Sequence, residues 1–245
     1  MAQIEGKNPV IEGLKGNRKI NKIYLRKDIK GKKITHIKKE AEKQGIPLEE
    51  VSKKEMKNLA SSQVPQGVVA LAEEIDLKEP EDILKNARIK EETPFIVILD
   101  HLKDPYNFGA IIRTAYAAGA HGIIFPKDRA ASITPVVVKA SAGAIEHIMM
   151  SKVTNINYTI DKLKNERVWI AGADLAEDAR PFYNMDFERS TAVVIGSEGD
   201  GLKRLVKENC DFLIKIPMQG AVSSLNASVA AGIVLFEVRR QRITQ

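Results

Sequence analysis

Residues 194–202, with the sequence VIGSEGDGL, carry the pattern that decides the fold of the longer, C-terminal part of this chain. An uninterrupted apolar run at 192–195 breaks into a loop with three glycines, and a helical pattern follows. Apolar runs without alternation are typical of strands that are covered on both faces, as in a parallel sheet flanked by helices. The stretch therefore predicts an α/β domain in which this loop follows the carboxyl end of a strand.

Further apolar runs extend this prediction in both directions along the chain. Short segments rich in Ile and Val occur at residues 95–99, 122–125, 168–171 and 212–216, and helical patterns separate them. Strands that alternate with helices indicate a parallel sheet. Residues 224–242 are predicted to form a long last helix, whose apolar early face would be buried in its own domain or in a partner subunit.

The N-terminal part differs in charge. Residues 1–70 hold 16 Lys and Arg against 8 Asp and Glu, a balance of +8, whereas residues 71–245 hold 22 against 24. A basic module suits a phosphate backbone, and a solubilising lysine-rich surface would have the same composition. Predicted elements in this module are a helical turn at 9–14, a strand at 20–25, a helix at 33–44 and a strand at 68–72.

The acidic run at residues 71–93 contains Pro80, is followed by Pro94, and has room for one short helix at 80–87. This run predicts a domain boundary. We expect a small basic module at residues 1–75, a linker at 76–93 and a second domain at 94–245.

Composition excludes several classes of protein. Hydrophobic residues make up 44% and charged residues 29% of the 245 residues, and the apolar runs are far shorter than the roughly 18–20 residues of a membrane span. The first residues lack the pattern of a secretion signal, so we expect a cytoplasmic protein without membrane contact. The chain has a single cysteine, Cys210, which we expect to be a packing residue. The four histidines lack metal-ligand spacing, so we expect no metal.

Residues 100–118, DHLKDPYNFGAIIRTAYAA, form the first cluster of candidate functional residues. A strand is predicted to end at Asp100, and Asn107 is predicted to open a helix as its N-cap. Gly109 allows another chain segment or a ligand to approach closely. Arg113 would lie well inside this helix, as a functional residue or as an ordinary surface arginine.

The glycine-rich loop is the second cluster. It lacks the Lys-Ser/Thr of a phosphate-binding loop, and Glu198 and Asp200 would repel phosphate. A cationic ligand or a hydroxyl-rich sugar fits this loop better, and a tight turn with surface acids is the alternative.

Residues 216–228, IPMQGAVSSLNAS, are the third cluster, in which Ser224, Asn226 and Ser228 enter the last helix. At least one of these side chains is predicted to cap the helix. No Ser/His/Asp order, HExxH, CxxC or GxGxxG pattern supports a hydrolase, zinc or dinucleotide site.

Together, the segments NFGAIIRTAYAAGA, VVIGSEGDGL and IPMQGAVSSLNASVAAGIVLFEVRRQR resemble the three motifs of the SpoU branch of the SPOUT RNA methyltransferases. They occur in the family's order and near its spacing. Residues 1–75, with NPVIEGL and QGVVA, more weakly resemble the ribosomal-protein-like RNA-binding domain found in members that act on large-subunit ribosomal RNA. Pro65 replaces the histidine that usually precedes QG in that domain.

The resemblance implies a SPOUT domain with a C-terminal trefoil knot that binds S-adenosylmethionine, and a homodimer. Gly196, Ile216 and Leu225 would hold the adenosyl group, largely through backbone contacts. The implied reaction site consists of Asn107, Arg113, Glu198, Ser224 and Asn226.

The implied activity is methylation of a ribose 2′-hydroxyl in structured RNA, with a guanosine of large-subunit (23S) ribosomal RNA as the expected target. Three alternatives stay open at this point. The first is the same chemistry on transfer RNA, and the second is a non-catalytic RNA-binding or ribosome-assembly protein. A nucleotide-binding α/β protein is the third, and the acidic second cluster disfavours it.

Charge chemistry constrains the role of Arg113. A neutral guanidinium at pH 7 would cost about 7 kcal/mol, so we expect a charged Arg113. Our hypothesis is that it grips an RNA phosphate and stabilises the developing alkoxide. Glu198 would orient Arg113 or the ribose, and Asn107 and Asn226 would hold the loop and substrate geometry.

Overall fold

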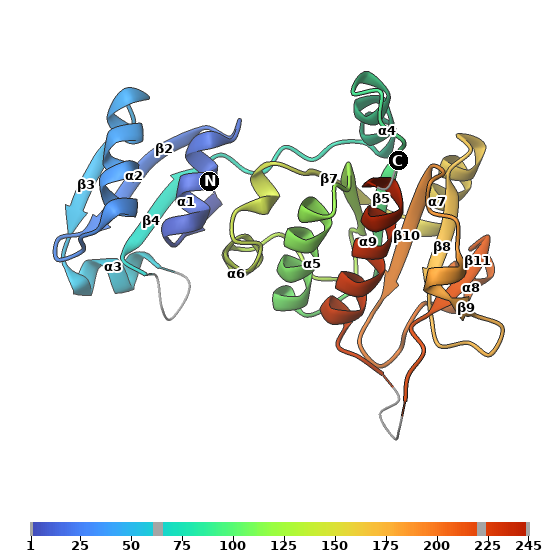
Figure 1. Ribbon diagram of the computed structural model, residues 1–245. Helices are drawn as coiled ribbons and strands as arrows, with labels where there is room; N and C mark the ends of the chain where they lie inside the picture. Colours follow the sequence, from blue (N-terminus) through green and yellow to red (C-terminus); the bar gives the residue numbers. More distant parts are fainter. Residues whose placement is uncertain (1, 61–65, 220–223, 244–245) are drawn as a thin grey trace.

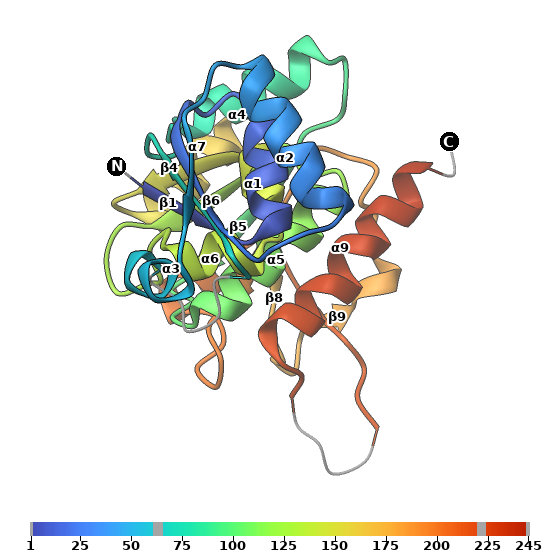
Figure 2. The same cartoon turned by 90° about the vertical axis from the view of Figure 1, so that its left-hand side faces the viewer.

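The computed structural model describes residues 2–60, 66–219 and 224–243, which form a small N-terminal module and a larger C-terminal α/β domain (Figure 1). Figure 2 looks at the molecule from the side of the module, with the C-terminal domain behind it. The predicted fold class, a small α/β module before a parallel-sheet domain, is confirmed. No helix in these ranges is long and apolar enough to cross a membrane.

The module is a four-stranded sheet in the order β1-β4-β2-β3, with β2 and β3 parallel and the other pairs antiparallel. Its elements are β1 (Ala2–Glu5), α1 (Lys7–Lys15), β2 (Ile20–Arg26), α2 (Lys32–Lys43), β3 (Leu48–Val51), α3 (Lys53–Leu59) and β4 (Val68–Ala72). The four elements predicted here are confirmed. The sequence did not predict β3 and α3, because each buries a single apolar side chain, Val51 or Met56. Pro65 lies outside the described residues.

The C-terminal domain is built on a seven-stranded, fully parallel sheet in the order β7-β6-β5-β10-β8-β11-β9. Its strands are β5 (Phe95–Asp100), β6 (Gly122–Pro126), β7 (Met149–Val153), β8 (Trp169–Ala173), β9 (Arg180–Pro181), β10 (Thr191–Gly196) and β11 (Phe212–Lys215). All five strands predicted here are confirmed. The edge strands β7 and β9 were not predicted, because β7 includes Ser151 and Lys152 and β9 has only two residues.

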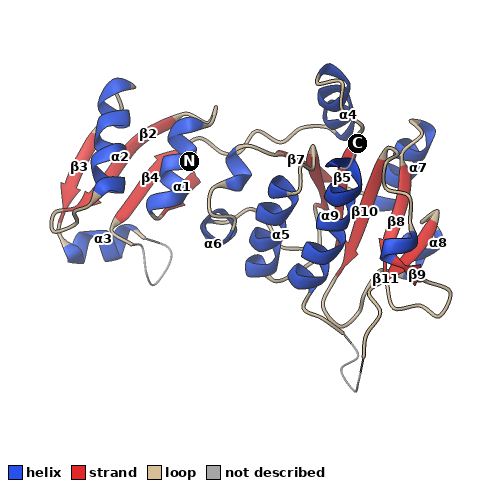
Figure 3. Ribbon diagram, in the orientation of Figure 1, coloured by secondary structure: helices blue, strands red, loops and turns tan. Residues whose placement is uncertain are grey.

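Helices cover both faces of this sheet (Figure 3). They are α4 (Pro80–Ile89), α5 (Pro105–Ala117), α6 (Pro135–Ala140), α7 (Ile156–Asn165), α8 (Arg204–Glu208) and α9 (Ala227–Ile243), with short 3-10 turns at Ala144–Glu146 (η1) and Phe182–Asn184 (η2). Side chains of β5 alternate between two cores, because neighbouring strand residues point to opposite faces. Val97 packs in the core that includes α5, α6 and α9, and Ile98 packs in the core that includes α4, α7 and α8.

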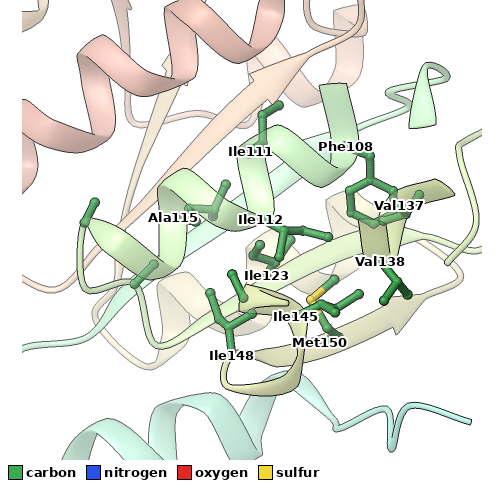
Figure 4. Packing of buried hydrophobic residues seen from close by; sticks show 14 of the residues in the cluster. Phe108, Ile111, Ile112, Ala115, Ile123, Val137, Val138, Ile145, Ile148 and Met150 are labelled. Atoms are coloured by element: carbon green, nitrogen blue, oxygen red, sulfur yellow. The ribbon is translucent and has the colours of Figure 1, made fainter. Parts of the chain in front are cut away.

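Helix α5 is anchored over its whole length, as Figure 4 shows. Phe108, Ile111 and Ile112 are buried, and the Phe108 ring lies 5.2 Å from the Phe125 ring, centroid to centroid. Gly109 is needed for the contact with α6, because a Cβ there would lie 2.4 Å from the Cβ of Ala140. The close approach predicted at Gly109 is thus an approach of another part of the same chain.

The predicted connector contains α4, and this helix belongs to the C-terminal core. Ile83 and Leu84 are buried against β5 and β6, and a Cβ at Gly122 would lie 2.5 Å from Ile83. Before α4, the amide of Lys78 donates to the carbonyl of Met150 on β7. Leu77 also forms a parallel bridge with Met150, so only the part of the connector before Leu77 spans the two domains without pairing with the sheet.

A buried ion pair joins the two domains. Arg18 follows α1 and donates from Nη2 to Oε1 of Glu146 in η1 at 2.6 Å, with both side chains buried. Burial lowers the pKa of the Arg18 guanidinium and raises the pKa of the Glu146 carboxyl, while the partner charges act in the opposite direction. Breaking such a pair leaves an uncompensated buried charge, so the pair holds the module in place on the sheet domain.

Cys210 is a packing residue, as predicted. Its sulfur lies against Gly172, where an added Cβ would come within 2.7 Å, and the thiol donates to the carbonyl of Val206. Burial raises the pKa of the Cys210 thiol to about 12. The thiol is therefore protonated and unreactive at neutral pH.

His121 couples the stability of the C-terminal domain to pH. Its Nδ1 accepts from the amide of Phe95 at 3.0 Å, so Nε2 carries the proton and donates to Glu92 at 2.9 Å. Burial lowers the pKa of His121 below its ordinary value. The unfolded chain therefore binds the proton more readily, so this contribution to stability is present above about pH 6.5 and is lost as the pH falls below it.

We predict that the free energy of unfolding in urea decreases between pH 7.5 and pH 5, and that His121→Gln flattens this decrease. His36→Gln is the control, since His36 is exposed on α2. If His121→Gln and His36→Gln gave the same pH dependence, the neutral state of buried His121 would not contribute to it.

Candidate active site

The pairing of β5 with β10 creates the candidate site. The two strands run parallel, with Gly196 opposite Asp100 at their carboxyl ends. The loops that leave these strands are therefore neighbours, although most of the domain separates them in sequence. In open parallel sheets, ligands bind at this edge.

The first loop enters α5 one turn earlier than predicted. Asp104, not Asn107, is the N-cap: its carboxylate accepts from the amides of Tyr106 and Asn107, both at 3.1 Å, and Pro105 is the first helical residue. The N-cap prediction for Asn107 is wrong, because an acid before Pro at the first helical position caps a helix equally well. The Asn107 side chain is instead available for a contact across the site.

That contact joins two of the predicted reaction residues. Nδ2 of Asn107 donates a hydrogen bond to Oε1 of Glu198, and Asn107 is buried while Glu198 is exposed. Oε2 of Glu198 has no hydrogen-bond partner among the described residues. A buried amide thus sets the orientation of an exposed carboxylate at the edge of the sheet.

The glycine-rich loop is a tight turn, one of the two alternatives predicted for it. The amides and carbonyls of Ser197 and Gly201 bond reciprocally, at 3.1 and 3.0 Å, and Gly201 has a φ of +65°. Gly196 permits this closure, because a Cβ there would lie 2.3 Å from the Gly201 carbonyl carbon. At Gly196 the turn therefore places backbone atoms, rather than a side chain, next to the space beside it.

That space is a cavity of about 590 Å³ beside β10 and β11. All three residues predicted to hold the adenosyl group, Gly196, Ile216 and Leu225, line it, as do Glu198 and Asn226. Ser224, also predicted for the reaction site, is exposed and lines the same cavity. The structure thus gathers the second and third sequence clusters around one cavity.

Asn226 also has a structural role. Its Oδ1 accepts from the amides of Ser228 at 3.0 Å and Val229 at 3.3 Å, at the start of α9. The prediction that one polar residue of this cluster caps the last helix is confirmed. Gly220, part of the same cluster, lies outside the described residues.

Arg113 stands apart from these residues. It is exposed on α5 and does not line the cavity. In the described ranges its guanidinium has no hydrogen bond or ion pair, and the Glu198 carboxylate meets Asn107 instead. The predicted orientation of Arg113 by Glu198 is therefore not formed within this single chain, and Arg113 is available to an external partner.

Three residues of the cavity were not singled out from the sequence. Asp174 follows β8 and pairs with Lys207 at 2.7 Å, and both line the cavity. Oγ of Ser197 is buried and has no hydrogen-bond partner in the described part of the chain. Asp174 and Ser197 could have been identified from the sequence, because each follows a predicted strand and the carboxyl ends of parallel strands meet at one edge of the sheet. Among the described residues, no group of His, Cys, Asp and Glu could hold a metal ion.

We predict that Gly196→Ala lowers the free energy of unfolding by about 1–3 kcal/mol, the usual cost of overpacking, because the loop must move to admit the Cβ. Gly199→Ala is the control: its φ of +79° disfavours alanine, but nothing lies within 4 Å of an added Cβ. Urea unfolding and the amide NMR signals of Ser197 and Gly201 measure the difference. Equal destabilisation, with the signals unchanged, would mean that the Gly196 contact is unimportant.

Known proteins resemble this chain over nearly its whole length. A Bacillus subtilis protein assigned by its name to the TrmH family of tRNA/rRNA methyltransferases, YacO, is 48% identical over 237 residues, which are 97% of this chain and 94% of the relative. The SpoU methyltransferase AviRb of Streptomyces viridochromogenes, solved in complex with AdoMet, superposes with a TM-score of 0.81 at 25% identity, covering 99% of this chain and 91% of AviRb.

An AdoMet-bound rRNA methyltransferase of Sinorhizobium meliloti gives a TM-score of 0.76 at 27% identity and covers 98% of this chain and 87% of its own. Residues 3–77 match the family described as RNA 2′-O ribose methyltransferase substrate binding. Residues 94–236 match the SpoU rRNA Methylase family. The resemblance inferred from the three motifs is thereby confirmed, and the chain belongs to the SpoU family of RNA methyltransferases.

Proposed function

We propose that this chain transfers a methyl group from S-adenosylmethionine to a ribose 2′-hydroxyl of structured RNA, with a guanosine of large-subunit (23S) ribosomal RNA as the target. The observation that carries the proposal is the cavity between the glycine-rich turn and the start of α9, next to the Asn107–Glu198 pair. This activity on ribosomal RNA would take place in the cytoplasm.

The cavity suits S-adenosylmethionine in size and chemistry. Its volume of about 590 Å³ lies within the range of small-molecule sites. Ile195, Ile214 and Val234 give it an apolar wall, and the orphaned Ser197 hydroxyl offers a polar contact. The carboxylates of Glu198 and Asp200 complement a positively charged ligand, as the acidic loop predicted, whereas Asp174 is paired with Lys207.

When bound, S-adenosylmethionine supplies a methyl group on a positively charged sulfur. In our proposal, backbone atoms of Gly196, Ile216 and Leu225 hold the adenosyl group. Oε2 of Glu198 accepts a hydrogen bond from the ribose, with Asn107 holding the carboxylate in place. Methyl transfer from this sulfur to an oxygen is an in-line displacement, and aligning the reacting groups is its main requirement.

Arg113 has the remaining role in the proposal. It stays charged, grips an RNA phosphate, and stabilises negative charge on the 2′-oxygen while the proton leaves to water or a phosphate oxygen. Its exposure and the lack of an ion pair in the described residues support this role, because the guanidinium is available to RNA.

The basic module supports ribosomal RNA as the substrate. Lys32 and Lys39 are exposed on α2 and have no partner among the described residues, whereas Lys33 donates to Asn8 and Lys38 pairs with Glu50. We assign this module to RNA affinity and target choice and the sheet domain to chemistry. Transfer RNA is the alternative substrate.

We also propose a homodimer and a C-terminal knot. Val229, Ile233 and Phe236 are 51%, 37% and 50% exposed and lie along one face of α9, which its own domain leaves uncovered. For the knot, the support is that the turn at 196–201 and the segment leading into α9 line the same cavity.

The decisive experiment measures methyl transfer from labelled S-adenosylmethionine to ribosomal and transfer RNA and maps the 2′-O-methyl sites. We expect Arg113→Ala to lower the rate by roughly 10²–10³-fold, the usual effect of losing one stabilising donor. Arg113→Lys should fail as well, because it lacks the planar fork. Calorimetry should show unchanged S-adenosylmethionine binding in both variants, since Arg113 does not line the cavity.

An Arg113→Lys variant within a few-fold of wild type would remove the geometric part of this role. Wild-type protein that binds S-adenosylmethionine and RNA but methylates neither RNA would indicate a non-catalytic RNA-binding or ribosome-assembly protein.

For the dimer, we predict that light scattering gives twice the chain mass at micromolar concentration and that Phe236→Glu shifts it to the monomer mass. Ile89→Glu is the matched control, because Ile89 is 72% exposed on α4, outside the proposed interface. A monomeric wild-type protein would contradict the proposal.

A further inference from the structure

A second cavity of about 590 Å³ opens at the same edge of the sheet, and its lining is basic. It is lined by His101, Lys103, Arg129, Ala130 and Lys203, so that four of the five residues can carry positive charge and none is acidic. This cavity shares no lining residue with the cavity proposed for S-adenosylmethionine. It therefore needs an explanation of its own.

Three neighbouring loops build the cavity. They follow β5, β6 and β10, which lie side by side in the order β6-β5-β10. Two hydrogen bonds hold the loops together: the backbone amide of Ala131 donates to the carbonyl of Leu102 at 2.7 Å, and the backbone amide of Lys203 donates to the side-chain Oδ2 of Asp100 at 2.6 Å. The basic side chains are thus carried by loops of defined geometry rather than by free surface segments.

The side chain of Asp100 contacts two of the loops that build the cavity. It is fully buried, and its second oxygen, Oδ1, contacts Nδ1 of His101 at 2.5 Å. A carboxylate accepts, so Nδ1 carries the hydrogen, and Nε2 has no partner in the described ranges. His101 and Arg129 have φ angles of +57° and +55°, a region that side-chain-bearing residues rarely adopt and that is found at ligand sites.

Apart from His101, which contacts Asp100, the basic side chains of this cavity lack strong partners among the described residues. Lys103 and Arg129 have no hydrogen bond or ion pair in the part of the chain that the structure describes, and neither takes part in the ion pairs found there. Lys203 meets Asp200 at 3.4 Å, and both side chains are about half exposed, so this pair contributes little. Cations that face one cavity repel each other unless an anion lies between them.

The cavity also adjoins the proposed reaction site. The loop that carries Lys103 leads into α5 and Asn107, and the loop that carries Lys203 begins with the turn that carries Glu198. A strand of RNA with its ribose at the Asn107–Glu198 pair would therefore have its adjacent backbone near the basic loops. With no apolar residue larger than Ala130 in its lining, the cavity suits a phosphate rather than a base.

We propose that this cavity binds a phosphodiester group of the RNA backbone next to the target nucleotide, with Arg129 and Lys103 as its main contacts. This inference rests on the proposed function, because it assumes an RNA substrate. The site would contribute to affinity and to placement of the ribose, and it takes no part in the chemical step.

The test uses the full-length protein and a structured fragment of ribosomal RNA and measures affinity over a range of salt concentrations. Each phosphate contact contributes about 0.7 to 0.9 to the slope of log affinity against log salt. Arg129→Ala and Lys103→Ala should each reduce the slope by about that amount and weaken binding several-fold at low salt. Affinity for S-adenosylmethionine should not change.

Lys85→Ala is the matched control. Lys85 is exposed on α4 and has no partner among the described residues, so this variant loses the same charge far from the basic loops. Its slope and its affinity for RNA should equal those of the wild type. An equal effect of all three variants would show that only net charge matters and would overturn the site.

Two further results separate the possible failures. If wild-type protein methylates RNA but Arg129→Ala and Lys103→Ala keep the wild-type slope, the phosphate site is wrong and the proposed function stands. If the slopes change but no RNA is methylated, the proposed function fails and the site remains an RNA contact. If inorganic phosphate or pyrophosphate alone shifts the His101 NMR signal at concentrations that do not displace RNA, the cavity takes free phosphate and the proposal is overturned.

Discussion

The parallel pairing of β10 with β5 is the contact on which the rest of the site depends. It places Gly196 opposite Asp100, so two loops that are distant in sequence leave the sheet side by side. Gly196 lets the second loop close tightly, and Asp100 holds the amide of Lys203 where that loop turns toward α8. A shift of one residue in this register would move each of these groups to the wrong face or the wrong depth.

The packing of α5 against the sheet and α6 fixes the position of Asn107 relative to the paired strands. Phe108, Ile111 and Ile112 fill one side of the helix, and Gly109 lets it approach α6. A helix held on two sides has little freedom to rotate or slide. The position of its first turn next to the glycine-rich loop is therefore fixed. The side-chain amide of Asn107 donates to Glu198 without any adjustment by a ligand.

The proposed division of function between the two domains follows their charge: the basic module binds RNA, and the sheet domain carries out the chemistry. The sheet domain is nearly neutral over residues 71–245, with 22 basic and 24 acidic residues, yet its carboxyl edge holds two cavities of different charge. Glu198 and Asp200 line the first, together with Lys215 and the Asp174–Lys207 pair, whereas all charged side chains that line the second are basic. Acids beside the first cavity suit a cationic ligand, and bases beside the second suit phosphate. The buried Arg18–Glu146 pair then holds the basic N-terminal module against the same domain, so that both could contact one RNA.

The sequence by itself determined the elements that have a clear local pattern. Apolar runs revealed β5, β6, β8, β10 and β11, and the motif residues Gly196, Ile216 and Leu225 proved to line one cavity. These features can be found locally, because strand burial and glycine-rich turns leave their mark on adjacent residues.

Only the tertiary structure decided which distant residues meet. The order β7-β6-β5-β10-β8-β11-β9 brings Lys103, Arg129 and Lys203 together from three loops, and no spacing in the sequence indicates this, because strand order is set by packing between segments far apart in the chain. The hydrogen bond from Asn107 to Glu198 also joins residues that are distant in sequence. Because Asp104 caps α5, the side chain of Asn107 is available for this bond. Edge strands such as β7 and β9 also escaped prediction, because a strand with one neighbour or two residues carries too little buried surface to mark its sequence.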